Sequence, residues 1–361
     1  MSIMASDTVR VAIIGCNGIA NIKSMPALAK LGNVEIAGFC DMIESRALAA
    51  KERFGTADSI VCTDYRRLLE DESIDAVHVL TPNRSHSFIT VDALEAGKHV
   101  MCEKPMAINT AEAQKMLDAA KRTGKKLTIS YQNRFRDDAI YMKKEAEDGN
   151  FGDIYYAKAT AIRRRGVPTW GVFLSEYEQG GGPLIDIGTH ALDLTLWIMN
   201  NYKPKYCVGT TYHALNKMHD QGNIWGNWDP EKFTVEDSAF GFIVMENGAT
   251  IVLESSWALN TLDVKEAVTS VCGTLAGADM QGGGLRINGV RNGRQYVLEP
   301  SFEAGGVGNA SISPGDREAS AWIDAIVNDK APLVLPEEAL VVTRILEGLY
   351  TSAKNGDIFR F

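Results

Sequence analysis

Three ionisable residues occupy positions from which they could move a proton. Lys104 follows an apolar run and precedes a proline, while Asp186 and His190 lie four positions apart where a glycine-rich stretch gives way to an apolar one. An imidazole titrates near neutral pH, at about 6.5, and an ammonium group can donate to a developing alkoxide. Residues four apart share one face of a helix, so Asp186 could orient the imidazole. This set suits general acid–base chemistry on a carbinol or carbonyl group.

Each of these residues also has a purely structural interpretation. Lysines usually lie at the surface, although the buried strand expected before Lys104 argues against that here. His190 is followed by the strongly apolar stretch 191–197, where a histidine could simply pack in the core. Asp186 could cap the helix that begins after it, and Asp193 is a second candidate partner for His190.

The composition narrows the class of protein. With 361 residues, two domains are expected. Hydrophobic residues at 45% and charged residues at 23% are typical of a globular chain, and the net charge of −9 disfavours a nucleic-acid partner. No stretch approaches the about 20 apolar residues that span a bilayer, so no membrane is expected. The six cysteines are scattered and the histidines lack metal-ligand spacing, which predicts a cytoplasmic protein without a metal.

Apolar strands alternate with helical segments over the first third of the chain. Strands are expected at 9–14, 34–40, 59–62, 76–80, 99–102 and 127–131, with helices between them, at 26–29, 45–54, 65–69, 85–96 and 110–122. This alternation predicts a doubly wound parallel α/β sheet, with residues 1–132 forming one domain. Ligands of such sheets bind beyond the carboxyl ends of the strands.

A dinucleotide-binding signal follows the first expected strand. In the pattern G-x-G-x-x-G/A, Gly15 and Ala20 fit the first and third small positions, whereas Asn17 replaces the second glycine. Asparagine tolerates left-handed backbone, and Gly18 adds freedom, so Gly15, Asn17, Gly18, Ile19 and Ala20 are candidate cofactor-binding residues. A plain strand-to-helix turn is the alternative.

Asp41, at the end of the second expected strand, strengthens this hypothesis. A carboxylate there accepts hydrogen bonds from the adenosine ribose and repels a 2′-phosphate, which favours NAD over NADP. Arg46 is the nearby cation that could weaken that preference. Asp41 could also act as a helix N-cap.

The remainder, residues 133–361, is expected to form a second α/β domain. Strands are expected at 154–162, 206–213, 238–245, 249–257 and 268–275, and helices at 318–327 and 336–353. Glu246-Asn247-Gly248-Ala249 predicts one hairpin turn, and Asn288-Gly289 with Gln281-Gly282-Gly283-Gly284 suggests another hairpin pair.

Three motifs together resemble a known family. They are Thr81-Pro82-Asn83 with His86, Glu103-Lys104-Pro105, and the glycine-rich segment 180–190 that ends in D-x-x-x-H. With the dinucleotide signal, they make the chain similar to the glucose–fructose oxidoreductase, inositol dehydrogenase and rhizopine catabolism (Gfo/Idh/MocA) family. The resemblance implies an N-terminal Rossmann domain and a C-terminal α/β domain with a large, mostly antiparallel sheet. It also implies a homo-oligomer, a dimer or tetramer.

The resemblance implies site residues as well. Family members commonly oxidise or reduce a secondary hydroxyl of sugars or cyclitols, and Lys104, Asp186 and His190 match the positions that line their reaction centre. Residues at the nicotinamide half of the cofactor would be Thr81, Asn83, His86, Glu103, Lys104 and Pro105. A small polyhydroxylated substrate would contact Lys104, Asn133, Arg163, Trp170, Asp186 and His190. A salt bridge at the domain junction is an equal alternative for the segment of Asn133 and Arg134.

Two other functions are compatible with the sequence. One is a non-catalytic NAD-binding regulator, against which the intact Lys104 and His190 argue. The other is an NAD-using glycoside hydrolase, in which transient oxidation labilises the glycosidic bond.

Overall fold

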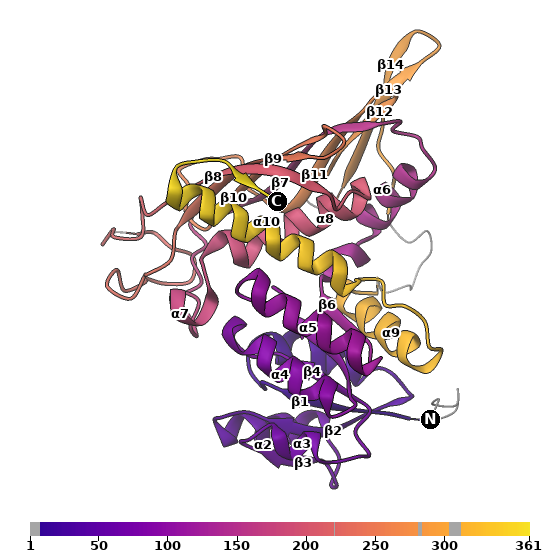
Figure 1. The fold of residues 1–361 in the computed structure, drawn as a ribbon, viewed down its shortest axis with the longest axis vertical. Coiled ribbons are helices and arrows are strands. Elements are labelled where there is room, and N and C mark those ends of the chain that lie inside the picture. Colours follow the sequence, from indigo (N-terminus) through magenta and orange to yellow (C-terminus); the bar gives the residue numbers. More distant parts are fainter. Residues whose placement is uncertain (1–7, 220, 281–283, 303–311) are drawn as a thin grey trace. The chain divides into compact units, whose positions relative to one another are not determined.

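The fold consists of two compact units. The computed structural model describes residues 8–219, 221–280, 284–302 and 312–361. The first unit comprises the chain up to Gln132 together with Ile312–Leu340, and the second comprises Asn133–Ser311 with Val341–Phe361 (Figure 1). The sequence analysis assigned 312–340 to the second domain. The segment packs with the first unit because Trp322 and Ile323 of helix α9 (Pro314–Val327) join its hydrophobic core.

The first unit contains a six-stranded, entirely parallel sheet in the order β3-β2-β1-β4-β5-β6. Its strands are β1 (Val9–Ile14), β2 (Val34–Cys40), β3 (Ile60–Cys62), β4 (Ala76–Val79), β5 (His99–Glu103) and β6 (Leu127–Ser130). Its helices are α1 (Met25–Leu28), α2 (Glu44–Phe54), α3 (Arg66–Leu69), α4 (Asn83–Glu95), α5 (Thr110–Thr123) and α9, with a π-helical turn, η1 (Ala20–Ser24), before α1. The predicted doubly wound sheet is confirmed, with its switch point between β1 and β4.

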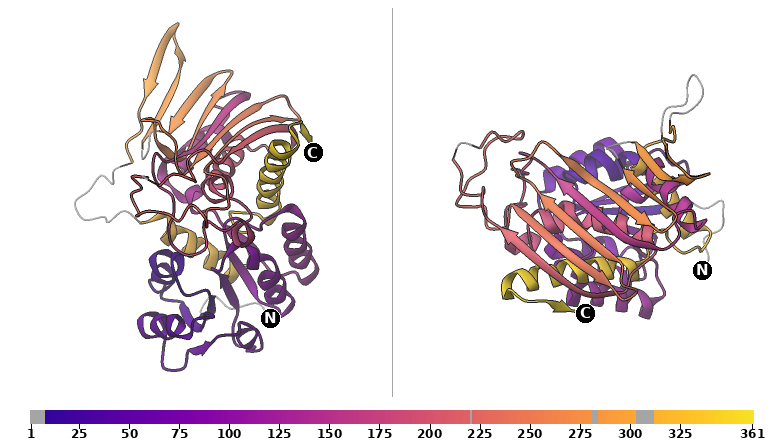
Figure 2. Two further views of the ribbon diagram at one scale, coloured as in Figure 1. Left: turned by 90° about the vertical axis from the view of Figure 1, so that its left-hand side faces the viewer. Right: turned by 90° about the horizontal axis from the view of Figure 1, so that it is seen from above.

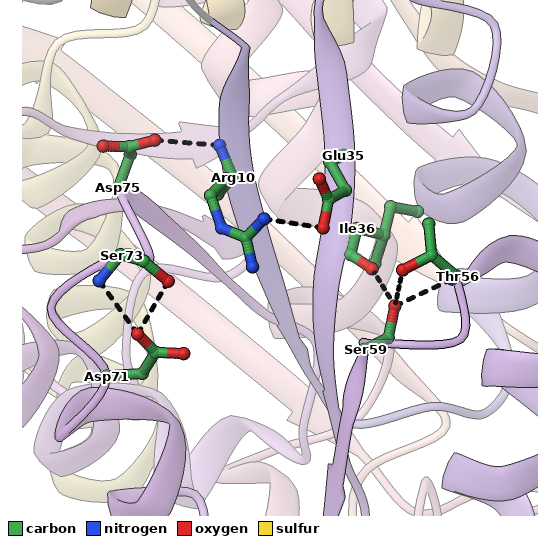
Figure 3. A network of polar contacts seen from close by, with 8 residues as sticks. All are labelled: Arg10, Glu35, Ile36, Thr56, Ser59, Asp71, Ser73 and Asp75. Carbon is green, nitrogen blue, oxygen red and sulfur yellow. Dashed lines mark hydrogen bonds and ion pairs between the residues drawn. The ribbon is translucent and has the colours of Figure 1, made fainter.

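Polar contacts hold the central strand β1 at its amino end (Figure 3). Arg10 Nη1 pairs with Glu35 Oε1 of β2 at 2.7 Å, and Arg10 N donates to Asp75 Oδ2, just before β4, at 2.8 Å. Ser59, before β3, donates to the carbonyl of Ile36 at 2.8 Å. These contacts join β1 to β2, β1 to the segment before β4, and β2 to the segment before β3.

The second unit contains a nine-stranded sheet in the order β14-β13-β12-β11-β7-β10-β9-β8-β15. All neighbours are antiparallel except β7 and β10. The strands are β7 (Ile154–Ile162), β8 (Pro204–Tyr212), β9 (Ser238–Met245), β10 (Thr250–Ser256), β11 (Lys265–Gly273), β12 (Ala276–Met280), β13 (Leu285–Arg291), β14 (Arg294–Leu298) and β15 (Phe359–Arg360). The helices are α6 (Asp137–Glu147), α7 (Glu176–Gln179), α8 (Thr189–Met199) and α10 (Pro336–Asn355), with turns η2 (Gln132–Phe135) and η3 (Leu184–Gly188). The large, mostly antiparallel sheet implied by the resemblance is confirmed.

Helices cover one face of this sheet, and the right-hand view of Figure 2 shows its other face. Helix α8 packs against β7 and β11 on the covered face. Gly209 and Gly241, on β8 and β9, admit Leu349 of α10, because a Cβ on Gly209 would lie 2.5 Å from the Leu349 carbonyl oxygen. The small residues therefore set the approach of α10.

One predicted turn is confirmed and another is wrong. The segment 246–249 joins the antiparallel pair β9 and β10, with Met245 N donating to the Ala249 carbonyl at 2.8 Å. Asn288 and Gly289, in contrast, lie inside β13, and the chain turns at Asn292-Gly293, both with positive φ. Of the related segment 281–284, residues Gln281, Gly282 and Gly283 lie outside the described residues.

The described residues contain no candidate for a membrane-spanning helix and none for a metal-binding cluster. None of the helices there combines the length and the apolar character needed to cross a membrane. No group of three or more His, Cys, Asp or Glu side chains in the same part of the chain could hold a metal ion.

Candidate active site

The loop between β1 and η1 has the shape that a dinucleotide pyrophosphate requires. Gly15 has a φ of +95°, and a Cβ there would lie 2.5 Å from the carbonyl oxygen of Leu80, so only glycine fits. Asn17 and Gly18 are exposed, Ile19 is half-buried, and Ala20 is fully buried against the sheet. Gly18, at φ +45°, has no atom within 4 Å of an added Cβ. The loop thus leaves its backbone open, although Asn17 replaces a glycine.

Asp41 is bound to this loop and is not the N-cap of helix α2. Its Oδ2 accepts from Cys16 N at 3.0 Å, and its Oδ1 accepts from Ile43 N at 2.9 Å. The N-cap position of α2 is Ile43, so the helix-cap alternative for Asp41 does not apply. Arg46 Nη1 lies 3.8 Å from Asp41 Oδ1. The carboxylate is therefore fixed beside the loop.

His86 joins the ends of β4 and β5. Its Nδ1 lies 2.8 Å from the Pro105 carbonyl and its Nε2 lies 2.9 Å from the Thr81 carbonyl, and the side chain is fully buried. Burial lowers the pKa of His86, whereas its hydrogen bonds to the Pro105 and Thr81 carbonyls oppose that shift, and the ring acts as a brace between the two strand ends. Asn83 begins α4 just beyond this brace. Thr81 and Pro105 are thereby brought together.

Glu103 belongs to a buried ionic cluster that the sequence analysis missed. Lys23 Nζ, from η1, lies 2.5 Å from Glu103 Oε1 and 3.2 Å from Glu318 Oε2 of α9, and it also donates to Ser130 Oγ. Burial alone would lower the pKa of Lys23, but the two carboxylates raise it above its ordinary value. Glu103 Oε2 accepts from the backbone N of Lys104 at 3.2 Å. The cluster thus fixes the backbone that carries the half-buried Lys104.

Asp186 and His190 lie at the junction of η3 and α8. Residues 181–190 are buried except for Asp186, which is half-buried. Asp186 lies within the π-helical turn, and His190 lies in the first turn of α8. Asp186 N donates to the Gly182 carbonyl at 3.0 Å. The motif therefore presents a carboxylate at the start of an otherwise buried helix.

Glu236, just before β9, binds the beginning of this turn. Its carboxylate accepts from Gly182 N at 2.8 Å, from Leu184 N at 3.1 Å and from the Tyr350 hydroxyl at 2.8 Å. These backbone donors have no partner within their own helix, so Glu236 acts as a cap supplied from a distant strand. Burial raises the pKa of Glu236 to about 7. The only signal in the sequence is the acidic pair Glu236-Asp237 before an apolar strand.

Trp257, after β10, contacts the side chain of Asp186. Its indole Nε1 donates to Asp186 Oδ2 at 3.0 Å. Burial alone would lower the pKa of Arg163, but its hydrogen bonds to Glu266 and the charges of Glu266 and Asp186 raise it. Arg163 Nε also donates to Glu266 Oε2 at 2.6 Å. Asp186 is thus flanked by an indole and a nearby cation.

The remaining candidate substrate-binding residues, Trp170 and Asn133, lie in other segments of the chain. Trp170 is half-exposed and belongs to the ring cluster that leads to Trp257. Asn133 is half-buried in η2. Asp193, the second candidate partner of His190, binds the buried Arg134 through both of its oxygens, at 3.0 and 2.6 Å, in a bidentate ion pair within the second unit.

Two family models match the chain. Residues 9–131 match an oxidoreductase family with an NAD-binding Rossmann fold, and residues 140–278 match the GFO/IDH/MocA C-terminal domain. A D-glucoside 3-dehydrogenase of Escherichia coli (strain K12) is 34% identical over 355 residues, which is 98% of each chain. The chain belongs to the Gfo/Idh/MocA oxidoreductase family. The resemblance inferred from the motifs is confirmed.

Further relatives of this Gfo/Idh/MocA protein are more distant. An inositol 2-dehydrogenase of Salmonella typhimurium is 26% identical over 198 residues, 54% of this chain and 56% of the relative. A solved structure of levoglucosan dehydrogenase in complex with NADH has a TM-score of 0.83 and 20% identity, covering 98% of this chain and 99% of that one. An aldose-aldose oxidoreductase of Caulobacter crescentus, complexed with glycerol, has a TM-score of 0.81 and 23% identity over 98% of this chain and 100% of that chain. These structures share the fold.

Proposed function

We propose that this oxidoreductase transfers a hydride between NAD and a secondary hydroxyl or ketone of a sugar, sugar derivative or cyclitol. The observation that carries the proposal is the half-buried Asp186 at the head of the His190 helix, bound by Trp257 and close to Arg163. A carboxylate in an otherwise buried turn, with aromatic side chains beside it, suits a polyhydroxylated ring. The full-length similarity to a D-glucoside 3-dehydrogenase supports this substrate class.

NAD is proposed as the cofactor in preference to NADP. When bound, it accepts the hydride from the carbinol carbon. Asp41 would accept hydrogen bonds from the ribose hydroxyls, and its charge disfavours a 2′-phosphate. The open loop at Gly15, Asn17, Gly18, Ile19 and Ala20 would approach the pyrophosphate, while Thr81, Asn83, His86, Glu103, Lys104 and Pro105 would border or brace the nicotinamide.

The proposed proton chemistry uses three side chains. His190 takes the hydroxyl proton, since an imidazole titrates near neutral pH. Lys104 donates to the oxygen as negative charge develops there. Asp186 orients the imidazole and stabilises its charged form. Arg163 and Trp170 are also proposed to bind the substrate. Asn133 is proposed to do so on the sequence pattern alone.

A homo-oligomer, a dimer or tetramer, is proposed through the uncovered face of the nine-stranded sheet. Phe242 of β9 is 45% exposed and its paired residue Val208 of β8 is 40% exposed. Tyr212 contacts Phe240 on the same face, with ring centroids 5.9 Å apart. Exposed apolar side chains on a sheet commonly mark a protein interface.

A cytoplasmic location is also proposed, because all six cysteines are unpaired, as in a reducing compartment.

The direct test measures formation of reduced nicotinamide by absorbance with a panel of sugars, glycosides and cyclitols. The proposal predicts turnover with NAD on at least one of them. Cleavage of a glycoside without net reduced cofactor would identify the hydrolase alternative instead. Tight NAD binding without turnover on any panel member would favour the regulator.

A further inference from the structure

A chain of aromatic rings leads from Asp186 to the protein surface. Trp257, which binds Asp186, is fully buried. Its ring centroid lies 6.5 Å from that of Phe173, which lies 5.9 Å from Trp170, which lies 5.0 Å from Trp225. Phe173 is half-buried, whereas Trp170 is 49% exposed and Trp225 is 41% exposed. The candidate site is therefore continuous with two surface tryptophans.

The two surface tryptophans are held in place by their loops. Thr169 Oγ1 donates to the Trp225 carbonyl at 2.7 Å. Asn223 accepts from Val167 N at 2.9 Å and donates to the Val167 carbonyl at 3.0 Å. These contacts tie the loop of Trp170 to the loop of Trp225, so the rings are arranged before any ligand binds. Preorganised aromatic groups bind ligands at a lower entropic cost.

The charges around the pair favour a neutral ligand. Arg163 lies over the Trp225 ring, 5.1 Å from its centroid, but binds Glu266 through two of its nitrogens. Arg165 is also engaged, since it donates to the Gln221 carbonyl at 3.1 Å and to Asn260 Oδ1 at 2.6 Å. A phosphate or carboxylate would compete with these partners for the cations. A neutral ring would not, and the apolar face of a sugar ring or an aryl group packs well on indole.

We infer that Trp170 and Trp225 form a distal subsite that binds the second ring of a neutral glycoside, either an aryl aglycone or a second sugar. The reacting sugar would lie beside Asp186 and Trp257. This inference rests on the proposed function and narrows its substrate class from sugars in general to glycosides. The two tryptophans contribute to selection of the substrate and not to the proton transfer.

The test compares a glucoside with an aryl aglycone and free glucose as substrates of the full-length protein with NAD. Trp170→Ala and Trp225→Ala should each lower kcat/KM for the glucoside about tenfold, and Trp225→Ala should change kcat/KM for glucose less than about twofold. Trp170→Phe and Trp225→Phe, which keep a ring, should restore most of the loss. Tyr155→Ala serves as a control, since Tyr155 is an exposed aromatic residue on β7, 57% exposed, outside this cluster.

Calorimetry measures the binding of the same two ligands. It therefore tests the subsite independently of the proposed reaction. Binding of the glucoside that weakens in both alanine variants, without turnover of any sugar, glycoside or cyclitol of the panel by the wild type, would support the subsite and contradict the dehydrogenase proposal. Turnover of both ligands with equal losses in the variants, or with no loss for the glucoside, would overturn the subsite and leave the dehydrogenase proposal standing.

Discussion

The indole of Trp257 donates a hydrogen bond to the carboxylate of Asp186 over 3.0 Å. This contact links the residue after β10 to the π-helical turn before α8, and it fixes the carboxylate that would orient His190. Glu236 fixes the backbone of the same turn through Gly182 and Leu184. The proposed catalytic carboxylate is thus positioned twice, once through its side chain and once through its main chain.

Trp257→Phe should lower kcat about tenfold, because Asp186 loses a hydrogen bond to a charged group, an interaction of about 1.5–3 kcal/mol. The affinity for NAD should not change, since the residue lies in the second unit. Steady-state kinetics with the best substrate of the panel measure the effect. Trp228→Phe is the matched control, because that indole donates to the Asn216 carbonyl at 2.8 Å and not to a carboxylate. An unchanged kcat in Trp257→Phe would remove the positioning role.

Glu236→Gln should change how stability depends on pH. Burial raises the pKa of Glu236 from 4.5 to about 7, so the folded state holds the proton more tightly than the unfolded state between these values. The free energy of unfolding therefore falls as the pH rises through 7, and glutamine does not titrate. Urea denaturation should show the wild type losing about 2 kcal/mol relative to the variant between about pH 5.5 and about pH 8.5.

The exposed Glu231→Gln in the same unit is the control for that measurement. It should leave a pH profile parallel to that of the wild type. The interpretation of Glu236 is contradicted if Glu236→Gln also follows the wild-type profile in parallel.

Lys23→Met should lower the free energy of unfolding by about 3–5 kcal/mol, because it leaves Glu103 and Glu318 buried without a counter-ion. Lys30→Met removes an ion pair to Asp316 from a side chain that is 62% exposed, and should cost less than about 1 kcal/mol. Chemical denaturation of both variants gives the comparison. Equal costs would show that the buried cluster is not held by charge.

Asp41→Ala should shift the cofactor preference toward NADP. The variant loses the charge that disfavours a 2′-phosphate and leaves Arg46 near the position where that group would bind. The ratio of kcat/KM for NAD to that for NADP should fall by about 100-fold. A ratio within about twofold of the wild type would mean that Asp41 only shapes the loop through Cys16 and Ile43.

Local patterns predicted the first unit well because each element there carries its own signal. The strand β1, the loop at Gly15 and the position of Asp41 follow from consecutive residues. The return of α9 to this unit could not be predicted, since its apolar face fits any core. The Asn288-Gly289 turn failed for a related reason. Asn292-Gly293 carries the same dipeptide, and strand pairing, which is not local, decides between them.

The candidate site divides in the same way between local motifs and distant partners. Lys104, Asp186 and His190 belong to short motifs, whereas their positioning partners lie far away in the chain. Glu236 binds a turn 52 to 54 residues before it, and Trp257 lies 71 residues after Asp186. Such contacts depend on the register of β9 and β10 in the sheet. That register cannot be predicted from a single sequence.

The central claim is that Lys104 and His190 act on one substrate hydroxyl. The decisive experiment is a single-turnover measurement of reduced-nicotinamide formation in Lys104→Ala and His190→Ala. The NAD affinity of both variants is measured in parallel. The account predicts that each variant loses at least about 100-fold in rate and still binds NAD, and that the double variant is little slower than either single one. Retention of near wild-type rates by both single variants would contradict it.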